Sequence, residues 1–161
     1  MELSTTLILI SVFILMEAFF SGSEIGMIAI NRIKMKQKAD EGNVSARIVL
    51  NLLDTPEKLF ATTSFGTNLA VVSSTSIFTA YMVTHMGKQG EIWAIIILSP
   101  IILFGGEIVP KMIMQNRADS VMPILVKPLN LSLGLLSPII SFSPVFQAIS
   151  PIKYSVYLIQ M

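Results

Sequence analysis

The chain has 161 residues, of which 53% are hydrophobic and only 13% are charged, and its mean hydropathy is +0.73. This composition lies outside the soluble globular range and predicts an all-α, multi-pass protein of the cell membrane, in the inner or plasma membrane. The formal net charge of +1 is too small to indicate a nucleic-acid partner, and the lack of cysteine excludes disulfides and thiolate chemistry. His85 is the single histidine and cannot form a histidine metal cluster.

Residues 1–30 are predicted to form the first membrane span. Residues 4–20 are apolar apart from early hydroxyl side chains, Ser11 and Glu17, and residues 21–30 bring the segment past the roughly 20 residues that a spanning helix needs. The segment has no basic region at its start and no obvious stop after it. We therefore expect a retained span here and not a cleaved signal peptide.

The second half of this span, SGSEIGMIAI, has an unusual arrangement of small and polar residues. Gly22 and Gly26 form a small-xxx-small pair, and Ser21 and Glu24 share a helix face. One interpretation is a close helix contact or a dimer interface through the glycines. The other is that Ser21 and Ser23, on loosened backbone, offer oxygen ligands to a cation, with Glu24 beside them.

Residues 31–54 are predicted to form a hairpin of two short helices on the membrane surface. The turn is expected at Gly42, and Asn43 can cap the second helix. Because basic residues near spans favour the cytoplasmic side, this hairpin is expected in the cytoplasm. The basic residues concerned are Arg32, Lys34, Lys36, Lys38, Arg47 and Lys58.

Residues 58–84 are predicted to form the second span, after a helix start at Asp54-Thr55-Pro56-Glu57. The span lacks internal charge but carries a polar stripe at helical spacing. Its members are Ser64, Thr67, Asn68, Thr75 and Thr79. Such a stripe either holds helices together or supplies neutral ligands, and the amide carbonyl of Asn68 can bind a cation.

Residues 92–110 are predicted to form the third span, with Trp93 at its outer interface and a bend at Pro100. The span ends in IILFGGEIVPK, where Glu107 follows two glycines and precedes Pro110 by three positions. Pro110 has no N–H for the carbonyl of Gly106, so a bare carbonyl is expected beside an acidic side chain.

Oxygen ligands with one carboxylate, on broken backbone, are typical of sites for hard cations such as Mg²⁺. The alternative interpretation is that Glu107 lies near a helix end and pairs with Lys111, four residues later. The sequence leaves these two interpretations open.

Residues 112–161 are apolar but contain five prolines, which predict broken helices that lie in the interface or re-enter the membrane as a juxtamembrane segment. The prolines are Pro123, Pro128, Pro138, Pro144 and Pro151. Lys153 is expected to return the chain to the cytoplasm.

Three stretches together carry a family resemblance: FFSGSE with the basic turn after it (19–38), TSFGTNLAVV (63–72) and GGEIVPK (105–111). In this order and spacing they resemble the transmembrane domain of the CNNM/CorC family, which is linked to efflux of Mg²⁺ and cobalt. The resemblance covers nearly the whole chain as one domain, 1–161. It implies a homodimer with three kinked spans per protomer in the lipid bilayer, and an outside N-terminus. Full-length members continue into a cytoplasmic CBS-domain pair, which these 161 residues do not contain.

The resemblance also implies site residues. The serine of the family's first motif corresponds to Ser21, the glycine and asparagine of its second to Gly66 and Asn68, and its acid to Glu107, with Pro110 as helix breaker. Many relatives have the glycine and asparagine adjacent, whereas Thr67 separates them here.

We therefore predict a transporter that exports Mg²⁺, with bends at Gly22, Gly66 and Pro110 converging on one site. Glu107 supplies charge, and backbone carbonyls and the side chains of Ser21, Ser23 or Ser64 and Asn68 supply neutral oxygens.

Moving charge against a negative-inside potential costs about 2.3 kcal/mol per charge per 100 mV, and about twice that for Mg²⁺. Export therefore needs coupling to an inward ion such as Na⁺, with the polar stripe of 58–84 and Glu24 as candidate carriers. The alternative is a membrane-anchored Mg²⁺ sensor that regulates another transporter. An enzyme is not expected, because the sequence contains no HExxH motif, phosphate loop or nucleophile–base pair.

Overall fold

The computed structural model describes residues 2–141, and the regular structure in that part is entirely helical. Three helical stretches are long and apolar enough to cross a membrane, namely Leu3–Ala29, Pro56–Met86 and Gln89–Pro138. The first is α1 (Leu3–Ala29) and the second is α4 (Pro56–Met86). The third combines α5 (Gln89–Ile101), a π-helical segment η1 (Ile102–Ile108) and most of α6 (Val109–Ser141). The predicted all-α architecture is confirmed, with three helical stretches that could cross a membrane.

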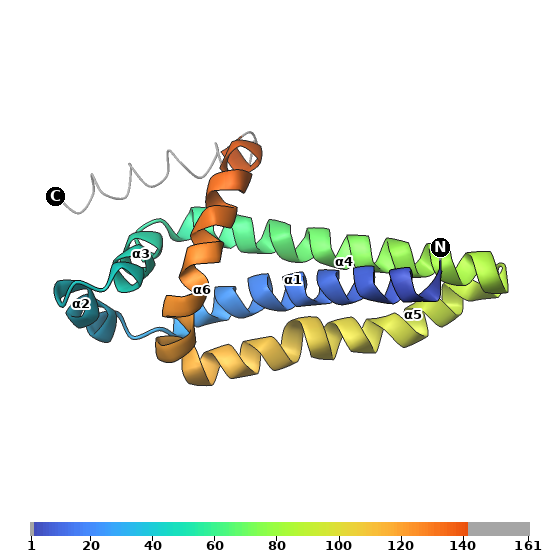
Figure 1. Ribbon diagram of the computed structural model, residues 1–161, viewed down its shortest axis with the longest axis horizontal. Helices are drawn as coiled ribbons and strands as arrows, with labels where there is room; N and C mark the ends of the chain where they lie inside the picture. The colour runs from blue at the N-terminus through green and yellow to red at the C-terminus, as the bar shows by residue number, and fades with distance from the viewer. Residues whose placement is uncertain (1, 142–161) are drawn as a thin grey trace, which may run out of the picture.

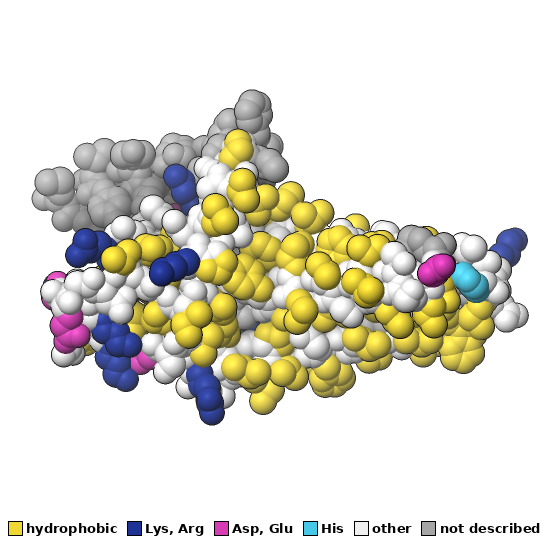
Figure 2. Space-filling model, in the orientation of Figure 1, with side chains coloured by type: hydrophobic (Ala, Val, Ile, Leu, Met, Phe, Trp, Pro, Cys, Tyr) yellow, Lys and Arg dark blue, Asp and Glu magenta, His cyan; other side chains and the backbone are white. Residues whose placement is uncertain are grey.

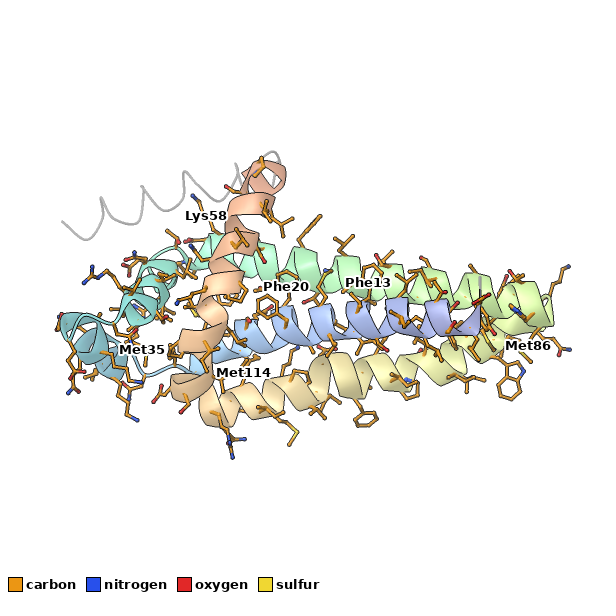
Figure 3. The ribbon with its side chains drawn as sticks, viewed as in Figure 1. Phe13, Phe20, Met35, Lys58, Met86 and Met114 are labelled. Carbon is orange, nitrogen blue, oxygen red and sulfur yellow. The ribbon has the colours of Figure 1, made fainter. Side chains whose placement is uncertain are left out.

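Helix α1 lies in the middle of the bundle, with α4 on one side and α5 and η1 on the other (Figure 1). Two apolar clusters hold it there. The first lies toward the end of the bundle opposite the hairpin, where α4 is followed by α5, and joins Ile10, Phe78, Ala94 and Leu98. The second lies at the hairpin end and includes Phe20, Met27, Leu59, Met114, Met122 and Val126. Figure 3 shows Phe20 beside α4 and Met114 beside α1.

The hairpin predicted for 31–54 consists of α2 (Arg32–Asp40) and α3 (Val44–Leu53). Gly42 lies between them with φ +92°, a left-handed conformation that favours glycine. The side-chain oxygen of Asn43 accepts the backbone N–H of Ala46 at 3.1 Å, which confirms the predicted cap. Met35 and Val49 are fully buried and fix the hairpin to the rest of the bundle.

Charge is distributed unevenly along the long axis of the molecule. Figure 2 shows most of the lysines and arginines at the hairpin end, whereas apolar side chains cover the surface of the three crossings. Only about a fifth of the residues in each apolar window are buried within the single chain. Such an apolar, unburied surface suits contact with lipid, and the positive-inside rule predicts that the hairpin end faces the cytoplasm.

Helix α6 corrects one expectation about the prolines. Pro123, Pro128 and Pro138 were expected to break the segment, but α6 continues through them, and its non-helical residue is Arg117 (φ −127°, ψ 20°). Beyond this kink α6 turns across α1 toward α4 (Figure 1). Packing maintains the helix despite the lost N–H groups, because one face is fully buried in the core. This face includes Met122, Val126 and Leu129. Pro144, Pro151 and Lys153 lie outside the described residues.

Candidate functional site

The π-helical segment η1 brings the GGE motif against the middle of α1. The backbone N–H of Val109 bonds to the carbonyl of Phe104, five residues earlier, so the hydrogen-bond register changes just before Pro110. Gly106 packs so tightly on α1 that a methyl group placed on it would lie 2.6 Å or less from both carboxylate oxygens of Glu17. Only glycine therefore leaves room for an acidic side chain at this contact.

Glu17 is the most deeply buried charged side chain in the described part of the chain. It is 1% exposed and lies one residue from the midpoint of the 27-residue helix α1, near the expected centre of the bilayer. Its Oε2 atom has no hydrogen-bond partner among the described residues. Because a charged side chain at the centre of a membrane helix costs about 2.5–3.5 kcal/mol to insert, an acid retained there marks a functional position.

Two serines of α1 share this lack of partners. Ser21 is 2% exposed, and Ser23 is fully buried. The Oγ atoms of both have no hydrogen-bond partner among the described residues. Ser21 is four residues after Glu17, so the two side chains lie on the same helix face. One turn of α1 therefore presents a carboxylate and a hydroxyl group, both buried and both with free ligand capacity.

Glu107 has a different environment. Its Oε1 atom accepts a hydrogen bond from Nζ of Lys111 at 2.6 Å, and the Glu107 side chain is 44% exposed. The structure therefore contains the ion pair that the sequence analysis left open as an alternative. The segment that carries the pair remains close to α1, because Gly106, the residue before Glu107, packs against the Glu17 carboxyl.

Pro110 and Gly22 bring the same segments together one turn further on. A methyl group placed on Gly22 would lie 3.4 Å from Cβ of Pro110 and 3.2 Å from Cγ of Met114. Gly22 therefore serves as a close-contact position between α1 and α6. Glu107 is consequently not remote from the serine-glycine turn of α1, although its own side chain is half-exposed.

Helix α4 contributes a contact that the sequence analysis did not predict. Thr63 donates a hydrogen bond from Oγ1 to Oε2 of Glu24 at 3.1 Å, and Thr63 is fully buried. Gly66 is buried against Phe20, whose ring atoms would lie 2.4–2.7 Å from a methyl group at position 66. The observed role of Gly66 is thus to let α1 and α4 approach each other.

Two predicted ligands on α4 do not reach this region within the single chain. Ser64 and Asn68 lie on an exposed face of α4, and Nδ2 of Asn68 donates to the Ser64 carbonyl at 2.8 Å. The residues that α4 buries form a different stripe from the predicted polar one. This buried stripe comprises Leu59, Thr62, Thr63, Gly66, Ala70, Ser74 and Phe78.

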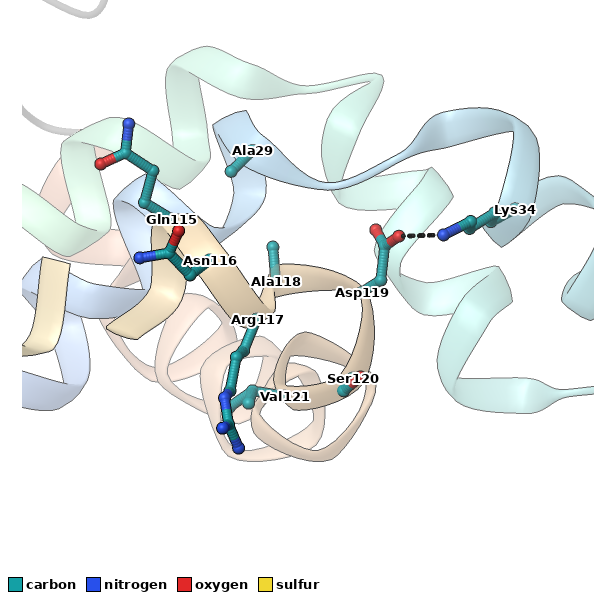
Figure 4. A pocket seen from close by; sticks show the side chains of 9 residues that line it. All are labelled: Ala29, Lys34, Gln115, Asn116, Arg117, Ala118, Asp119, Ser120 and Val121. Carbon is teal, nitrogen blue, oxygen red and sulfur yellow. Dashed lines mark hydrogen bonds and ion pairs between the residues drawn. The ribbon is translucent and has the colours of Figure 1, made fainter. Parts of the chain in front are cut away.

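An open hollow of about 520 Å³ lies at the hairpin end, beside the kink of α6. Figure 4 shows Asp119 at its edge, paired with Lys34 at 3.0 Å, and Arg117 extending away from this pair. Asp119 also accepts the backbone N–H of Asn31 at 2.8 Å. The carboxylate of Asp119 already accepts from these two donors, so the hollow is not a second candidate ion site. It lies where α1, α2 and α6 meet.

The contact between α1 and η1 offers few charged ligands to a cation. The described residues contain no group of three or more histidine, cysteine, aspartate or glutamate side chains placed to hold a metal. Ligands at the α1–η1 contact would be the carboxylate of Glu107, the hydroxyl group of Ser21 and backbone carbonyls, with the buried Glu17 carboxyl beside them. Such a set suits hard cations that prefer oxygen.

Glu17 is the residue that sequence reasoning missed as part of a site. Its signal was present, because it is an acid in the middle of an otherwise apolar segment. The sequence analysis noted it only as an exception to the apolar pattern and assigned it no role.

The fold and this polar contact define a multi-pass helical membrane protein with acidic side chains placed among its crossing segments. A profile described as the cyclin M transmembrane N-terminal domain (CNNM) matches residues 8–151, which is most of the chain. The chain belongs to this family. The family resemblance predicted from the three motifs is therefore confirmed.

Several curated proteins are similar to this chain. A UPF0053 protein of Haemophilus influenzae is 29% identical over 119 residues, which are 74% of this chain and 28% of that protein. The UPF0053 inner membrane protein YfjD of Escherichia coli is 34% identical over 96 residues, 60% of this chain and 22% of that protein. The polyamine export protein of E. coli is 39% identical over 67 residues, 42% of this chain and 15% of that protein. The matched region is thus at most 28% of each of these relatives.

Proposed function

We propose that the chain forms the membrane-crossing part of a transporter that exports a divalent cation, Mg²⁺, from the cytoplasm. The observation that carries the proposal is the contact between η1 and the middle of α1. There, Glu107 and its glycines lie beside a helix turn with a buried acid and an unpartnered serine. Sites of this kind, near the midplane and on interrupted helices, are typical of secondary transporters.

The proposed Mg²⁺ ligands are Glu107, Ser21 and backbone oxygens of the Gly105-Gly106 segment. Because Mg²⁺ requires near-octahedral oxygen ligands at roughly 2.0–2.1 Å and keeps several waters, a single carboxylate is compatible with modest affinity and release. Lys111 competes with the cation for Glu107, since its ammonium group already occupies Oε1. Mg²⁺ binding therefore displaces Lys111 from the carboxylate.

A second copy of the chain supplies the rest of the proposed site. The polar face of α4 with Ser64 and Asn68 is exposed in the single chain, and polar groups facing lipid are costly. We propose that a homodimer partner covers this face, and that CBS domains in the full-length protein regulate transport. Inward Na⁺ is the proposed driving ion.

A second candidate substrate is supported by one relative. The polyamine export protein of E. coli shares 39% identity over 67 residues. A polyamine, unlike Mg²⁺, is an elongated cation that two separated carboxylates can bind. Glu17 and Glu107 supply two carboxylates for this purpose. Mg²⁺ remains our first proposal because the oxygen donors here are those that small hard cations prefer.

The test is ion flux in liposomes that contain only the purified chain. We expect Mg²⁺ flux that depends on a Na⁺ gradient, and loss of this flux in Glu107→Gln. The folded structure should persist in this variant, because the amide oxygen of the introduced glutamine still offers an acceptor to the ammonium group of Lys111. Circular dichroism and thermal unfolding check the fold.

Spermidine flux without Mg²⁺ flux would favour the polyamine substrate. Binding of Mg²⁺ with no flux of either cation would favour a sensor that regulates another transporter. Equal Mg²⁺ flux through wild type and Glu107→Gln would contradict the site.

A further inference from the structure

Glu17 has an environment that the proposed Mg²⁺ ligands do not explain. It is an acid at the midpoint of α1, 1% exposed, with an unpartnered carboxylate oxygen in the described part of the chain. Lys111 follows Glu107 by one helical turn, and its ammonium group is bound to Glu107. Glu17 therefore has no counter-charge of its own among the described residues.

The charges around Glu17 determine which cation the cluster can hold. Glu107 and Lys111 form a pair at 2.6 Å with no net charge, so the three groups together leave one negative charge when Glu17 is ionised. In a region of low dielectric, a bound ion must match this charge closely. A small monovalent cation neutralises the cluster as it stands, whereas a divalent cation first requires the Glu107–Lys111 pair to separate.

Neutral oxygen ligands are available at the same level of the bundle. The hydroxyl group of Ser21, one turn after Glu17, is buried and unpartnered. The π-helical segment η1 packs its backbone directly on the Glu17 carboxyl through Gly106. Unwound or irregular helix backbone near the bilayer midplane is where transporters place carbonyl ligands for Na⁺.

Small residues on both neighbouring elements pack around the level of Glu17. Phe20 contacts Gly66, and Glu24 bonds to Thr63, so α1 and α4 are antiparallel in a register that puts Ala70 at the level of Glu17. Ala70 is fully buried there, and Gly106 faces the same level from η1. Any side chain larger than that of glycine at position 106 would displace the carboxylate.

We propose that Glu17 and Ser21 bind a small monovalent cation, with Na⁺ as the test case. This inference rests on the proposed function, because Ser21 then belongs to both the Mg²⁺ ligands and the monovalent site. Sharing one ligand makes the two cations compete, which is the linkage that exchange of one for the other requires.

The experiment measures Mg²⁺ binding to the purified chain by calorimetry while NaCl replaces N-methylglucamine chloride at constant ionic strength. For wild type we expect Na⁺ to raise the apparent Kd for Mg²⁺ by about fivefold or more, the lower end of typical coupling between linked sites. In Glu17→Gln, Mg²⁺ should still bind and Na⁺ should no longer change the Kd. Glu91→Gln, an exposed acid at the start of α5, is the matched control and should retain the wild-type response.

Gly106→Ala is the second variant, because its methyl group displaces the Glu17 carboxylate without removing it. It should also weaken the effect of Na⁺. Wild type that binds Mg²⁺ without any Na⁺ effect would overturn the monovalent site and leave the proposed Mg²⁺ function intact. Persistence of the Na⁺ effect in Glu17→Gln, loss of all Mg²⁺ binding in that variant, or a response to pH alone would each overturn it as well. Wild type that binds no Mg²⁺ would overturn both proposals.

Discussion

The contact between Gly66 and Phe20 gives a prediction whose size follows from the structure. A methyl group at position 66 would lie 2.4 Å from Cδ2 of Phe20, whereas ordinary Cβ contacts begin at 3.4 Å, so the ring must move by 3.4 − 2.4, or about 1 Å. Phe20 is 6% exposed and packs edge-on against Phe19 at a centroid distance of 5.1 Å, which limits this movement.

Two effects of Gly66→Ala oppose each other. Overpacking a filled core costs about 1–3 kcal/mol. Replacing glycine by alanine inside a helix returns roughly 0.5–1 kcal/mol. We therefore expect a net loss of about 0–2.5 kcal/mol in the free energy of unfolding. Gly134→Ala is the control, because nothing lies within 4 Å of a methyl group there and only the helix gain remains.

The assay is unfolding in mixed detergent micelles, followed by helical circular dichroism, for each single variant and for a double variant with Phe20→Ala. Removal of the ring opens a cavity and is itself destabilising by about 3–5 kcal/mol. In that background Gly66→Ala should cost nothing or stabilise, since the methyl group enters the space that the ring has left. The packing argument is refuted if Gly66→Ala and Gly134→Ala have equal stability, or if Phe20→Ala does not change the cost of the methyl group.

Two further predictions concern the hairpin end. Asn43→Ala should lower stability by about 1 kcal/mol, because the N–H of Ala46 loses its cap, and hydrogen exchange should accelerate at the start of α3 while α1 is unaffected. Asp119→Asn should cost only about 0–1 kcal/mol, since it removes the exposed ion pair with Lys34 and keeps an acceptor for the Asn31 N–H. Asp119→Ala removes the acceptor for both Lys34 and the Asn31 N–H, and should lower the free energy of unfolding by about 1 kcal/mol more than Asp119→Asn. Faster hydrogen exchange at Asn31 is the measurement. Equal stability of the two variants would contradict this account.

Local features of the sequence predicted most of the fold. A spanning helix is defined by the length of an apolar segment, and a helix start by its capping residue, so the three crossings and the Asn43 cap followed from short stretches of chain. The run of α6 through Pro123 and Pro128 did not follow. Its stability depends on a buried face that packs on distant helices, and proline spacing contains no information about that packing.

The candidate site was predicted in part, for a related reason. The glycine-glutamate motif and Ser21 come from segments that the structure brings close together, but the sequence does not determine which side of each helix faces its neighbour. Asn68 and Gly66 are two residues apart and lie on opposite sides of α4, one exposed and one buried. Glu17 is buried because Gly106 faces it, and this fact requires the packing of η1 on α1.

The positions of the two apolar clusters constrain how Glu17 could exchange a cation. The cluster with Ile10 and Phe78 packs the bundle at the end opposite the hairpin. The cluster with Phe20 and Met27 packs it at the hairpin end. Glu17 lies between the two clusters along α1, so an ion at the proposed site would have packed apolar side chains on either side of it along the helix. Since filled apolar cores do not deform continuously, the proposed transport would require the two clusters to separate one at a time, which would give access to one side of the membrane at a time.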